Sequence, residues 1–277
     1  MNVELRIRTS QVRILQDAPR ETKPRVAVML LGASCHFDRK HGENSPNADT
    51  GRRPNDANAD LQRSALGEAD TMSEEAAKKV LVVGASGLLG SKVVSALAGR
   101  ADVIAASRTG SPETVDITEK ASLEALFERV GTVDAIVCTA GMVRYVPWAN
   151  ATDDDWAHGL SQKLMGQVDL TRIGAPFVRD GGSITLTTGL LAQHPIPGSS
   201  IVSTVNAAVE GFVRAAAIEI GRGVRVNAVS PGWIAETMVA MGMDPLPGLP
   251  AADVAKRFVQ LIESDANGSI LVAARGA

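Results

Sequence analysis

Short apolar runs alternate with helical periods of hydrophobic residues from about residue 76 to the end of the chain. This alternation is typical of βαβ units, and continuous Val, Ile and Ala runs are typical of parallel strands covered on both faces. We therefore expect one α/β domain over residues 76–277, a single doubly wound Rossmann-type parallel sheet with helices on both faces. The expected strands are Val80–Val83, Val103–Ala106, Thr114–Ile117, Ala135–Cys138, Ser183–Thr187, Val224–Val229 and Ile270–Ala273. The expected helices are Leu88–Ala98, Ser122–Val130, Asp153–Arg179, Ser200–Gly221 and Ala251–Ser264, with Thr152 and Asp155 as a capping box.

Residues 1–75 show a different pattern. The segment Phe37–Asp60 has no Val, Ile, Leu or Met, so it cannot bury enough apolar surface to offset its ordering entropy, and we expect a disordered leader. The apolar run Val26–Ala33 is too short to span a membrane and starts too late for a good secretory signal, so we interpret it as a stray apolar segment. Met72 begins MSEEAAKKVLVVGASG, which reads like a natural start, and leaves open that the leader reflects an upstream start codon.

Composition excludes several classes of protein. Hydrophobic residues make up 45% and charged residues 21%, as in an ordinary globular chain and unlike collagen or a coiled coil. The formal net charge of −3 and the isoelectric point near 5.9 give no basic surface for nucleic acid. Two cysteines, Cys35 and Cys138, cannot build a disulfide framework, so we expect a reducing, cytoplasmic location. No spacing of His, Cys and acidic residues is typical of a metal site.

A glycine-rich turn follows the first expected strand directly. Gly84 allows the chain to leave the strand sharply, Gly87 lets a pyrophosphate approach the backbone, and Gly90 lets the helix pack on the strand. The helix N-terminus then supplies amide donors for the phosphates. The strand–turn–helix context predicts a dinucleotide site, the alternative being a structural turn in another α/β fold.

The second expected strand ends in Ser107-Arg108, without a carboxylate. An acidic residue there would bind the ribose 2′-hydroxyl of NAD and repel a 2′-phosphate. Ser107 and Arg108 can instead bind that phosphate, which favours NADP as the cofactor, unless Arg108 is simply a solvated arginine.

With these features, the chain resembles the short-chain dehydrogenases/reductases from about Lys79 to the C-terminus. The further motifs are Val-Asp116-Ile117, Cys138-Thr-Ala-Gly141 and Arg225-Val-Asn-Ala-Val-Ser-Pro-Gly232. By resemblance, the first flanks the adenine, the second runs beside the adenosine ribose, and the third ends at the nicotinamide. The middle glycine of the turn is one place earlier than in the main branch, as in extended or atypical branches. The implied cofactor contacts are Gly84, Ser86, Gly87, Leu89, Gly90, Ser107, Arg108, Asp116, Ile117, Thr139, Ala140, Gly141, Pro231, Gly232 and Ile234.

The catalytic residues that the resemblance implies are missing from their positions. The family uses a Tyr-x-x-x-Lys pair, a Ser and an Asn to protonate the alkoxide and steady it. Aligned on the segment that begins at Asn206, the Tyr position holds Val202 and the Lys position holds Asn206 itself. The Ser position holds Gly189, and the Asn position holds Lys163.

Four residues are candidates for the site, Lys163 among them. Lys163 could serve as proton donor if the cleft lowers its pKa, or it could be a solvated lysine. Thr188 could supply the missing Ser hydroxyl, or it could be an ordinary threonine at a strand end. Tyr145 could line the pocket or lie at the surface, and His194 is expected in a loop at the substrate mouth, where a solvated role is the plainer interpretation.

Two function hypotheses follow. The first is an NADP-dependent oxidoreductase with non-standard proton delivery, acting on a small carbonyl or hydroxyl compound beneath a short, Met-rich cover, Trp233–Pro250. The second is an inactive dinucleotide-binding sensor or accessory protein. The segment Val205–Ile220 is apolar on more than one face, and the family pairs this helix across a two-fold axis, so we expect a homodimer or homotetramer. We expect a small-molecule substrate and neither a nucleic-acid nor a membrane partner.

Overall fold

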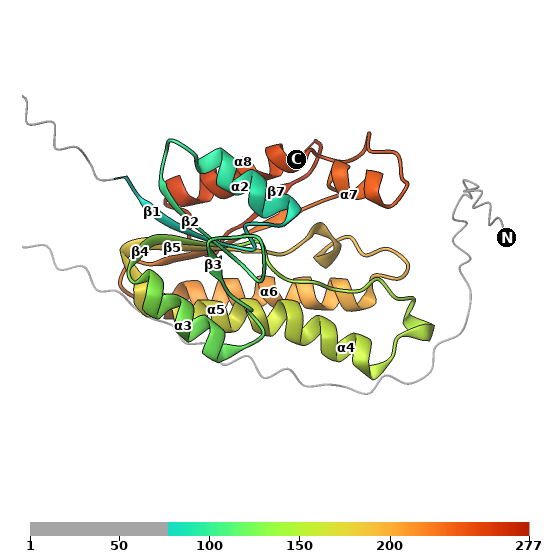
Figure 1. Cartoon of the computed structure of the whole chain (residues 1–277). Helices are drawn as coiled ribbons and strands as arrows, with labels where there is room; N and C mark the ends of the chain where they lie inside the picture. The colour runs from blue at the N-terminus through green and yellow to red at the C-terminus, as the bar shows by residue number, and fades with distance from the viewer. Residues whose placement is uncertain (1–76, 277) are drawn as a thin grey trace, which may run out of the picture. The chain divides into compact units, whose positions relative to one another are not determined.

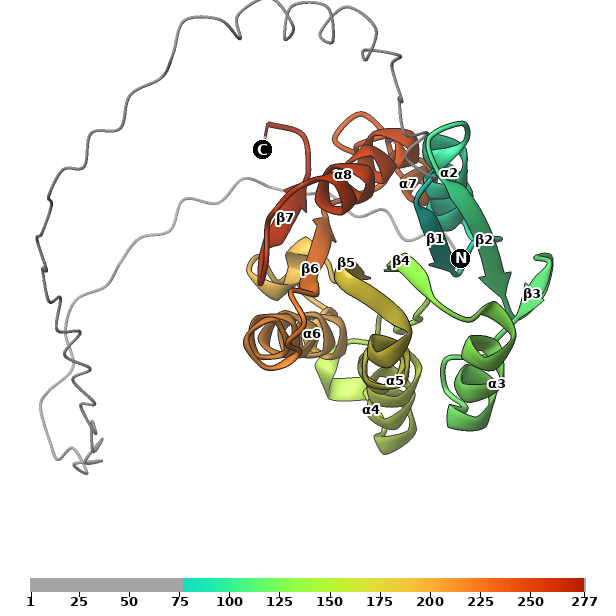
Figure 2. The same ribbon diagram turned by 90° about the vertical axis from the view of Figure 1, so that its left-hand side faces the viewer.

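The computed structural model describes residues 77–276. Its strands are β1 (Lys79–Val83), β2 (Asp102–Ser107), β3 (Glu113–Thr114), β4 (Val133–Cys138), β5 (Val178–Thr187), β6 (Arg225–Pro231) and β7 (Ile270–Ala273). All seven are parallel and form one sheet in the order β3-β2-β1-β4-β5-β6-β7 (Figures 1 and 2). The predicted doubly wound Rossmann-type sheet is therefore confirmed. The predicted leader and the possible start at Met72 lie outside the described residues.

Helices cover both faces of this sheet (Figure 1). One face carries α2 (Leu88–Leu97), α7 (Ala235–Ala240) and α8 (Ala251–Glu263). The other carries α3 (Lys120–Val130), α4 (Asp153–Gly159), α5 (Gly166–Gly174) and α6 (Ser200–Glu219). This arrangement gives each face of the sheet its own apolar layer of helices.

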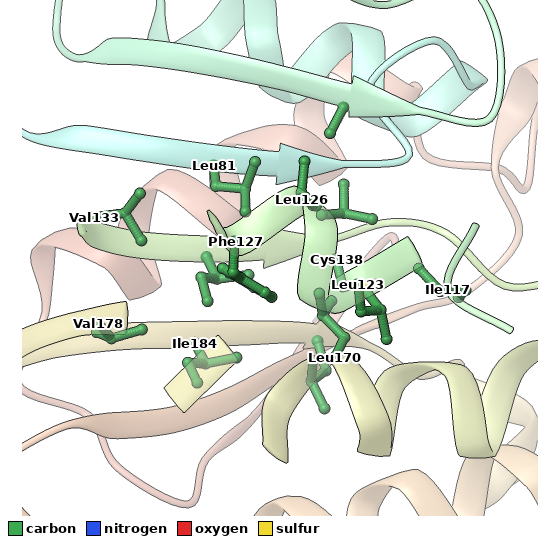
Figure 3. Packing of buried hydrophobic residues seen from close by; sticks show 14 of the residues in the cluster. Leu81, Ile117, Leu123, Leu126, Phe127, Val133, Cys138, Leu170, Val178 and Ile184 are labelled. Atoms are coloured by element: carbon green, nitrogen blue, oxygen red, sulfur yellow. The ribbon is translucent and has the colours of Figure 1, made fainter. Parts of the chain in front are cut away.

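Two hydrophobic cores follow from the alternation of side chains along the strands. In β1, Val80 and Val82 pack with Phe258 of α8, while Leu81 and Val83 belong to the cluster on the opposite face. That second cluster is built around Phe127 of α3, with which the strands and α5 make contact (Figure 3). Because both faces are apolar, the strands are near-continuous hydrophobic runs.

One helix in the described part of the chain, α6, is long and apolar enough to cross a membrane. Its residues Val209 and Val213 are fully buried and belong to the cluster that packs on the sheet. These contacts are those of a core helix in a Rossmann domain.

A predicted strand and a predicted helix differ clearly from the structure. The strand expected at Thr114–Ile117 is only Glu113–Thr114 long, because the chain then turns away to line a cavity. The helix expected at Asp153–Arg179 is broken into α4, a π-helical turn η2 (Leu160–Met165), α5 and a final 3₁₀ turn η3 (Ala175–Phe177). Pro176 lacks the amide hydrogen that a continuing α-helix needs, and β5 begins at Val178. The predicted capping box at Thr152 and Asp155 is confirmed.

The carboxyl ends of β1 and β4 form the switch point of the sheet. Val83 pairs with Ala106 of β2 on one side and with Cys138 of β4 on the other, and the chain crosses to opposite faces from here. Ligands of doubly wound sheets bind in the crevice outside this point. The loops after β1, β4, β5 and β6 all reach it.

Candidate active site

The turn after β1 is shaped by two tight glycine contacts. Gly84 has φ +88°, a conformation that other residues rarely adopt. A Cβ added to Gly90 would lie 2.0 Å from the carbonyl oxygen of Gly84, so the first turn of α2 packs directly on the loop. Gly87 is more open, since a Cβ there would meet only the same oxygen at 3.3 Å. The three glycines therefore provide a sharp turn, close helix packing and an approachable backbone.

A cavity of about 220 Å³ lies at the carboxyl ends of β1, β2 and β4. Its size and position suit the adenosine half of a dinucleotide. The structure brings together here most of the residues that the sequence predicted for the cofactor. These are Gly84, Ser86, Gly87, Ser107, Arg108, Asp116, Ile117, Thr139, Ala140 and Gly141.

Several polar groups around this smaller cavity form hydrogen bonds with neighbouring residues of the protein. The buried Ser107 accepts a hydrogen bond at Oγ from the amide of Ser86 (2.9 Å), which ties the end of β2 to the glycine turn. Asp116 accepts two hydrogen bonds from Thr118, at 2.9 and 2.8 Å. Burial raises the pKa of Asp116, but these bonds and the charge of Arg108 outweigh it, so the pKa lies below its usual value. Arg108 itself is exposed at the edge of the cavity.

A second, larger cavity of about 450 Å³ adjoins the first, and Gly141 lines both. The residues predicted to border the nicotinamide, Pro231, Gly232 and Ile234, line this cavity together with Leu89. Gly90 lines neither cavity, in agreement with its packing role. The remaining lining residues are mostly apolar: Val143, Tyr145, Lys163, Thr187, Thr188, Gly189, Leu190, Leu191, His194, Ile196, Val202, Asn206, Trp233, Thr237 and Met241.

Lys163 is the central polar residue of the larger cavity. Its Nζ donates hydrogen bonds to Oδ1 of Asn206 (2.8 Å) and to the carbonyl oxygen of Thr188 (3.1 Å). Desolvation of the ammonium lowers the pKa of Lys163 to about 8. The side chain passes directly beneath Gly141, where an added Cβ would lie 2.8 Å from Cγ of Lys163. The stem of Lys163 therefore lies beside Gly141, where the two cavities meet, and its amine extends to Asn206 and Thr188 in the wall of the larger cavity.

The backbone that carries Lys163 is a π-helical turn, η2, between α4 and α5. A π turn inserts one extra residue into a helix and is frequent at functional sites. Gly159, just before it, packs against Ile201, and Gly166, just after it, packs against Ile117. Close packing on both sides thus surrounds the turn that presents the amine to the cavity.

Asn206 and Gly189 fit together on the far side of the amine. Asn206 is buried in α6, and a Cβ added to Gly189 would lie 2.7 Å from its Nδ2. Gly189 has an extended backbone with φ 175°, so its lack of a side chain matters for space and not for backbone strain. Val202, one helical turn before Asn206, is buried at the cavity wall and offers no ionisable group.

The hydroxyl of Thr188 is directed into the protein. Its Oγ1 donates to the carbonyl oxygen of Asn206 (3.0 Å) and lies 3.3 Å from Oε1 of Glu210. Only the Thr188 backbone carbonyl meets Lys163. This geometry does not support the hydroxyl as a replacement for the family's Ser, because its hydrogen bonds are made with α6.

Tyr145 and His194 both line the larger cavity. Burial raises the pKa of Tyr145, although 49% of the residue is exposed, so its phenol stays neutral. His194 is exposed, in the loop after the 3₁₀ turn η4 (Leu190–Ala192). Within residues 77–276, no group of three or more His, Cys, Asp or Glu residues is placed to hold a metal ion.

Two buried polar residues that support the site, Gln167 and Glu210, were not predicted from the sequence. Gln167 of α5 donates to the carbonyl oxygen of Thr187 and accepts from its amide, both at 2.9 Å, so it fixes the end of β5. Glu210 accepts a hydrogen bond from Gln193 (2.5 Å) and so ties the loop after β5 to α6. The available signal was the polar pair Asn206 and Glu210, four residues apart on the valine-rich face of this helix.

The fold and these two adjoining cavities define a Rossmann-type α/β protein with its ligand crevice at the switch point of the sheet. Residues 65–261 match the family described as "Enoyl-(Acyl carrier protein) reductase". The chain therefore belongs to the short-chain dehydrogenase/reductase family of oxidoreductases.

Known structures and proteins agree with this membership. The protein lin1944 from Listeria innocua is 38% identical, with a TM-score of 0.69, and the match covers 71% of this chain and 100% of that one. A small-chain dehydrogenase solved in complex with NADPH is 26% identical, with a TM-score of 0.64, over 72% of this chain and 97% of the other. The acetoacetyl-CoA reductase of Cupriavidus necator is 32% identical over 143 residues, 50% of this chain and 58% of the enzyme. The chain spans between 47% and 63% of the length of such curated relatives.

Proposed function

We propose that this protein is an NADP-dependent reductase of a small, uncharged, mostly apolar carbonyl compound, with Lys163 as the proton donor. The observation that carries the proposal is that Lys163 lines the larger cavity and passes beside Gly141, the residue that both cavities share, with its pKa lowered to about 8. A group whose pKa is near the working pH can both hold a proton and give it up.

The residues of the smaller cavity fit the cofactor. The open backbone at Gly87 and the N-terminus of α2 would hold the pyrophosphate. Ser107 and Arg108 would hold a ribose 2′-phosphate, since β2 ends without a carboxylate that would repel it. The NADPH-bound relative supports this choice of cofactor.

The chemistry balances with one proton from the protein. NADPH, when bound, would supply a hydride to the carbonyl carbon and so both electrons of the reduction. As the C=O π bond breaks, Lys163 donates a proton to the oxygen, which gives the alcohol and leaves a neutral amine. The amine regains its proton from water, and its hydrogen bonds to Asn206 and to Thr188 hold it in place throughout.

The lining of the larger cavity supports the substrate class. Leucine, isoleucine, valine, methionine and tryptophan side chains form most of its wall. Among the described residues that line the cavity, Lys163 is the only lysine or arginine. Recognition of a phosphate or a carboxylate inside the cavity would require further cationic groups. The volume of about 450 Å³ is in the range of pockets for small ligands.

Consumption of NADPH with a panel of uncharged cyclic and aromatic ketones tests the proposal. We expect turnover by the parent protein and a loss of at least about 10²-fold in kcat for Lys163→Met, with NADPH affinity retained. Lys256→Met, the same change at a solvent-exposed lysine of α8, is the matched control and should leave kcat unchanged. Turnover that is unaffected by Lys163→Met would contradict the proposed donor.

The second candidate function is a dinucleotide-binding protein without redox chemistry. The observation that favours it is Val202, which brings no acid to the cavity wall where the resembled family has its Tyr. NADPH binding without turnover of any ketone, in the parent and in the variants, would select this alternative.

A further inference from the structure

The orientation of the Asn206 side-chain amide is determined by its neighbour. Lys163 Nζ can only donate hydrogen bonds, so the atom of the amide that faces it, at 2.8 Å, must be the oxygen Oδ1. The nitrogen Nδ2 is then directed the other way, toward Gly189. Both Asn206 and Gly189 line the larger cavity.

The Nδ2 group has no acceptor within the described residues. No hydrogen bond from this nitrogen is formed to a residue that the structure describes, and the atom is not among the fully buried polar atoms that lack a partner, so it stays partly accessible on a residue that lines the larger cavity. A buried side-chain amide usually satisfies its donors, because an unpaired N–H costs free energy. A free donor at a cavity wall is therefore a group prepared for a ligand.

Space for this donor exists only because residue 189 is glycine. A Cβ at this position would lie 2.7 Å from Nδ2 and would displace it. The missing side chain at Gly189 and the amide at Asn206 are thus complementary: one leaves the volume that the other fills.

The charge of Lys163 strengthens the donor. An ammonium that donates to Oδ1 draws electron density through the conjugated amide and makes the N–H groups of Nδ2 more positive. A donor polarised in this way, in a mostly apolar cavity, stabilises developing negative charge better than one in water.

We infer that Asn206 is a second catalytic residue, whose Nδ2 donates a hydrogen bond to the substrate oxygen as negative charge develops on it. Asn206 then replaces, from α6, the hydroxyl that Gly189 lacks, while Lys163 delivers the proton from η2. The inference rests on the proposed carbonyl reduction.

A rescue experiment separates a donor from a residue that only positions Lys163. Asn206→Ala should lower kcat for ketone reduction by about 10²–10³-fold, the effect of removing one such donor. Adding Gly189→Ser to Asn206→Ala puts a hydroxyl into the vacated space and should restore kcat by about tenfold or more, a fraction of that loss. Adding Gly189→Ala instead gives the same steric change without a donor and should restore nothing. NADPH affinity, measured for each variant, verifies that the site is folded.

The outcomes are distinct. Two results overturn the inference: a kcat of Asn206→Ala within about threefold of the parent, or equal rescue by alanine and by serine at position 189. Either result leaves the proposed reduction standing if Lys163→Met is inactive. A parent protein that reduces no ketone overturns the proposed function and the inference together. If Asn206→Ala no longer binds NADPH, the single variant Gly189→Ala decides. Its new Cβ should displace Asn206 Nδ2, so the hydrogen bond from Nδ2 to the substrate oxygen should be lost and kcat should fall. An unchanged kcat overturns the inference.

Discussion

The Lys163 ammonium is buried in an environment that disfavours its charged form. In the unfolded chain its pKa has the ordinary value of 10.5, and in the folded protein desolvation lowers it to about 8. Below pH 8 the lysine is charged in both states, so folding bears the full cost of burying the charge. Between pH 8 and 10.5 the folded state releases its proton first, and the cost decreases as the pH rises.

This cost gives a stability prediction. The free energy of unfolding of the parent should rise relative to that of Lys163→Met between pH 8 and pH 10.5, by on the order of 2 kcal/mol. Urea unfolding of both proteins near the two ends of this range measures the difference. A difference that stays constant over the range would show that the amine is solvated.

The proposed preference for NADPH depends on one exposed residue, Arg108. Arg108→Ala should weaken NADPH binding by about 10- to 100-fold, or about 1.5–3 kcal/mol, because it removes a charge-assisted bond to the 2′-phosphate. NADH binding should hardly change, since NADH lacks that phosphate. Parallel fluorescence titrations check both, and equal losses for the two cofactors would contradict the assignment.

Sequence comparison could find Lys163 and Asn206 but not their contact. The two residues are 43 positions apart, and only the packing of η2 against α6 brings the amine to the amide. The same contact changes how a Tyr-Lys pair would have to be introduced at the positions that the sequence alignment gives it. Val202→Tyr with Asn206→Lys alone would place a second amine beside Lys163, so Lys163→Asn must accompany them.

At the scale of elements, the strands were predictable because their apolar runs are continuous, and β1 and β7 match the expected ranges to within one residue. The π turn η2 was not, because Leu160–Met165 has no local signal that separates it from an α-helix. The short helix α7 was also missed. Its segment was expected only as a Met-rich cover, and Met241, at its end, does line the larger cavity.

The contact between α2 and the glycine turn gives a prediction at this scale. Gly90→Ala would place a Cβ 2.0 Å from the backbone oxygen of Gly84, which no side-chain movement can relieve. We expect a loss of NADPH binding and a destabilisation of roughly 2 kcal/mol or more, as for an overpacked core. Ser95→Ala, on the exposed face of the same helix, is the control and should bind NADPH normally. Unchanged affinity in Gly90→Ala would show that the turn does not hold the cofactor.

At the scale of the whole molecule, the topology was predictable because alternating strands and helices leave few right-handed arrangements. The residues predicted for the cofactor lie at the ends of β1, β2, β3, β4 and β6 or in the segments after them, and the sheet order brings them to one edge. The substrate could not be predicted, since the apolar wall of the larger cavity is assembled from separate loops and α6.

Assembly is a further expectation for the whole molecule. The helix α6 keeps apolar side chains away from its own core, among them Ile218, which is 86% exposed. We propose that α6 pairs with a second copy, as expected from the sequence, to form a homodimer or homotetramer. Light scattering at micromolar concentration should return a multiple of 28.9 kDa, and a monomer mass would contradict the proposal.

The pH dependence of kcat for NADPH-driven ketone reduction tests the central claim most directly. If Lys163 donates the proton, kcat should be level at low pH and fall about tenfold per pH unit above pH 8, as the amine loses its proton. Alcohol oxidation, which requires the neutral amine, should show the opposite dependence. A kcat for reduction that stays level to about pH 10, beyond the pKa of the buried amine, would contradict the role of Lys163.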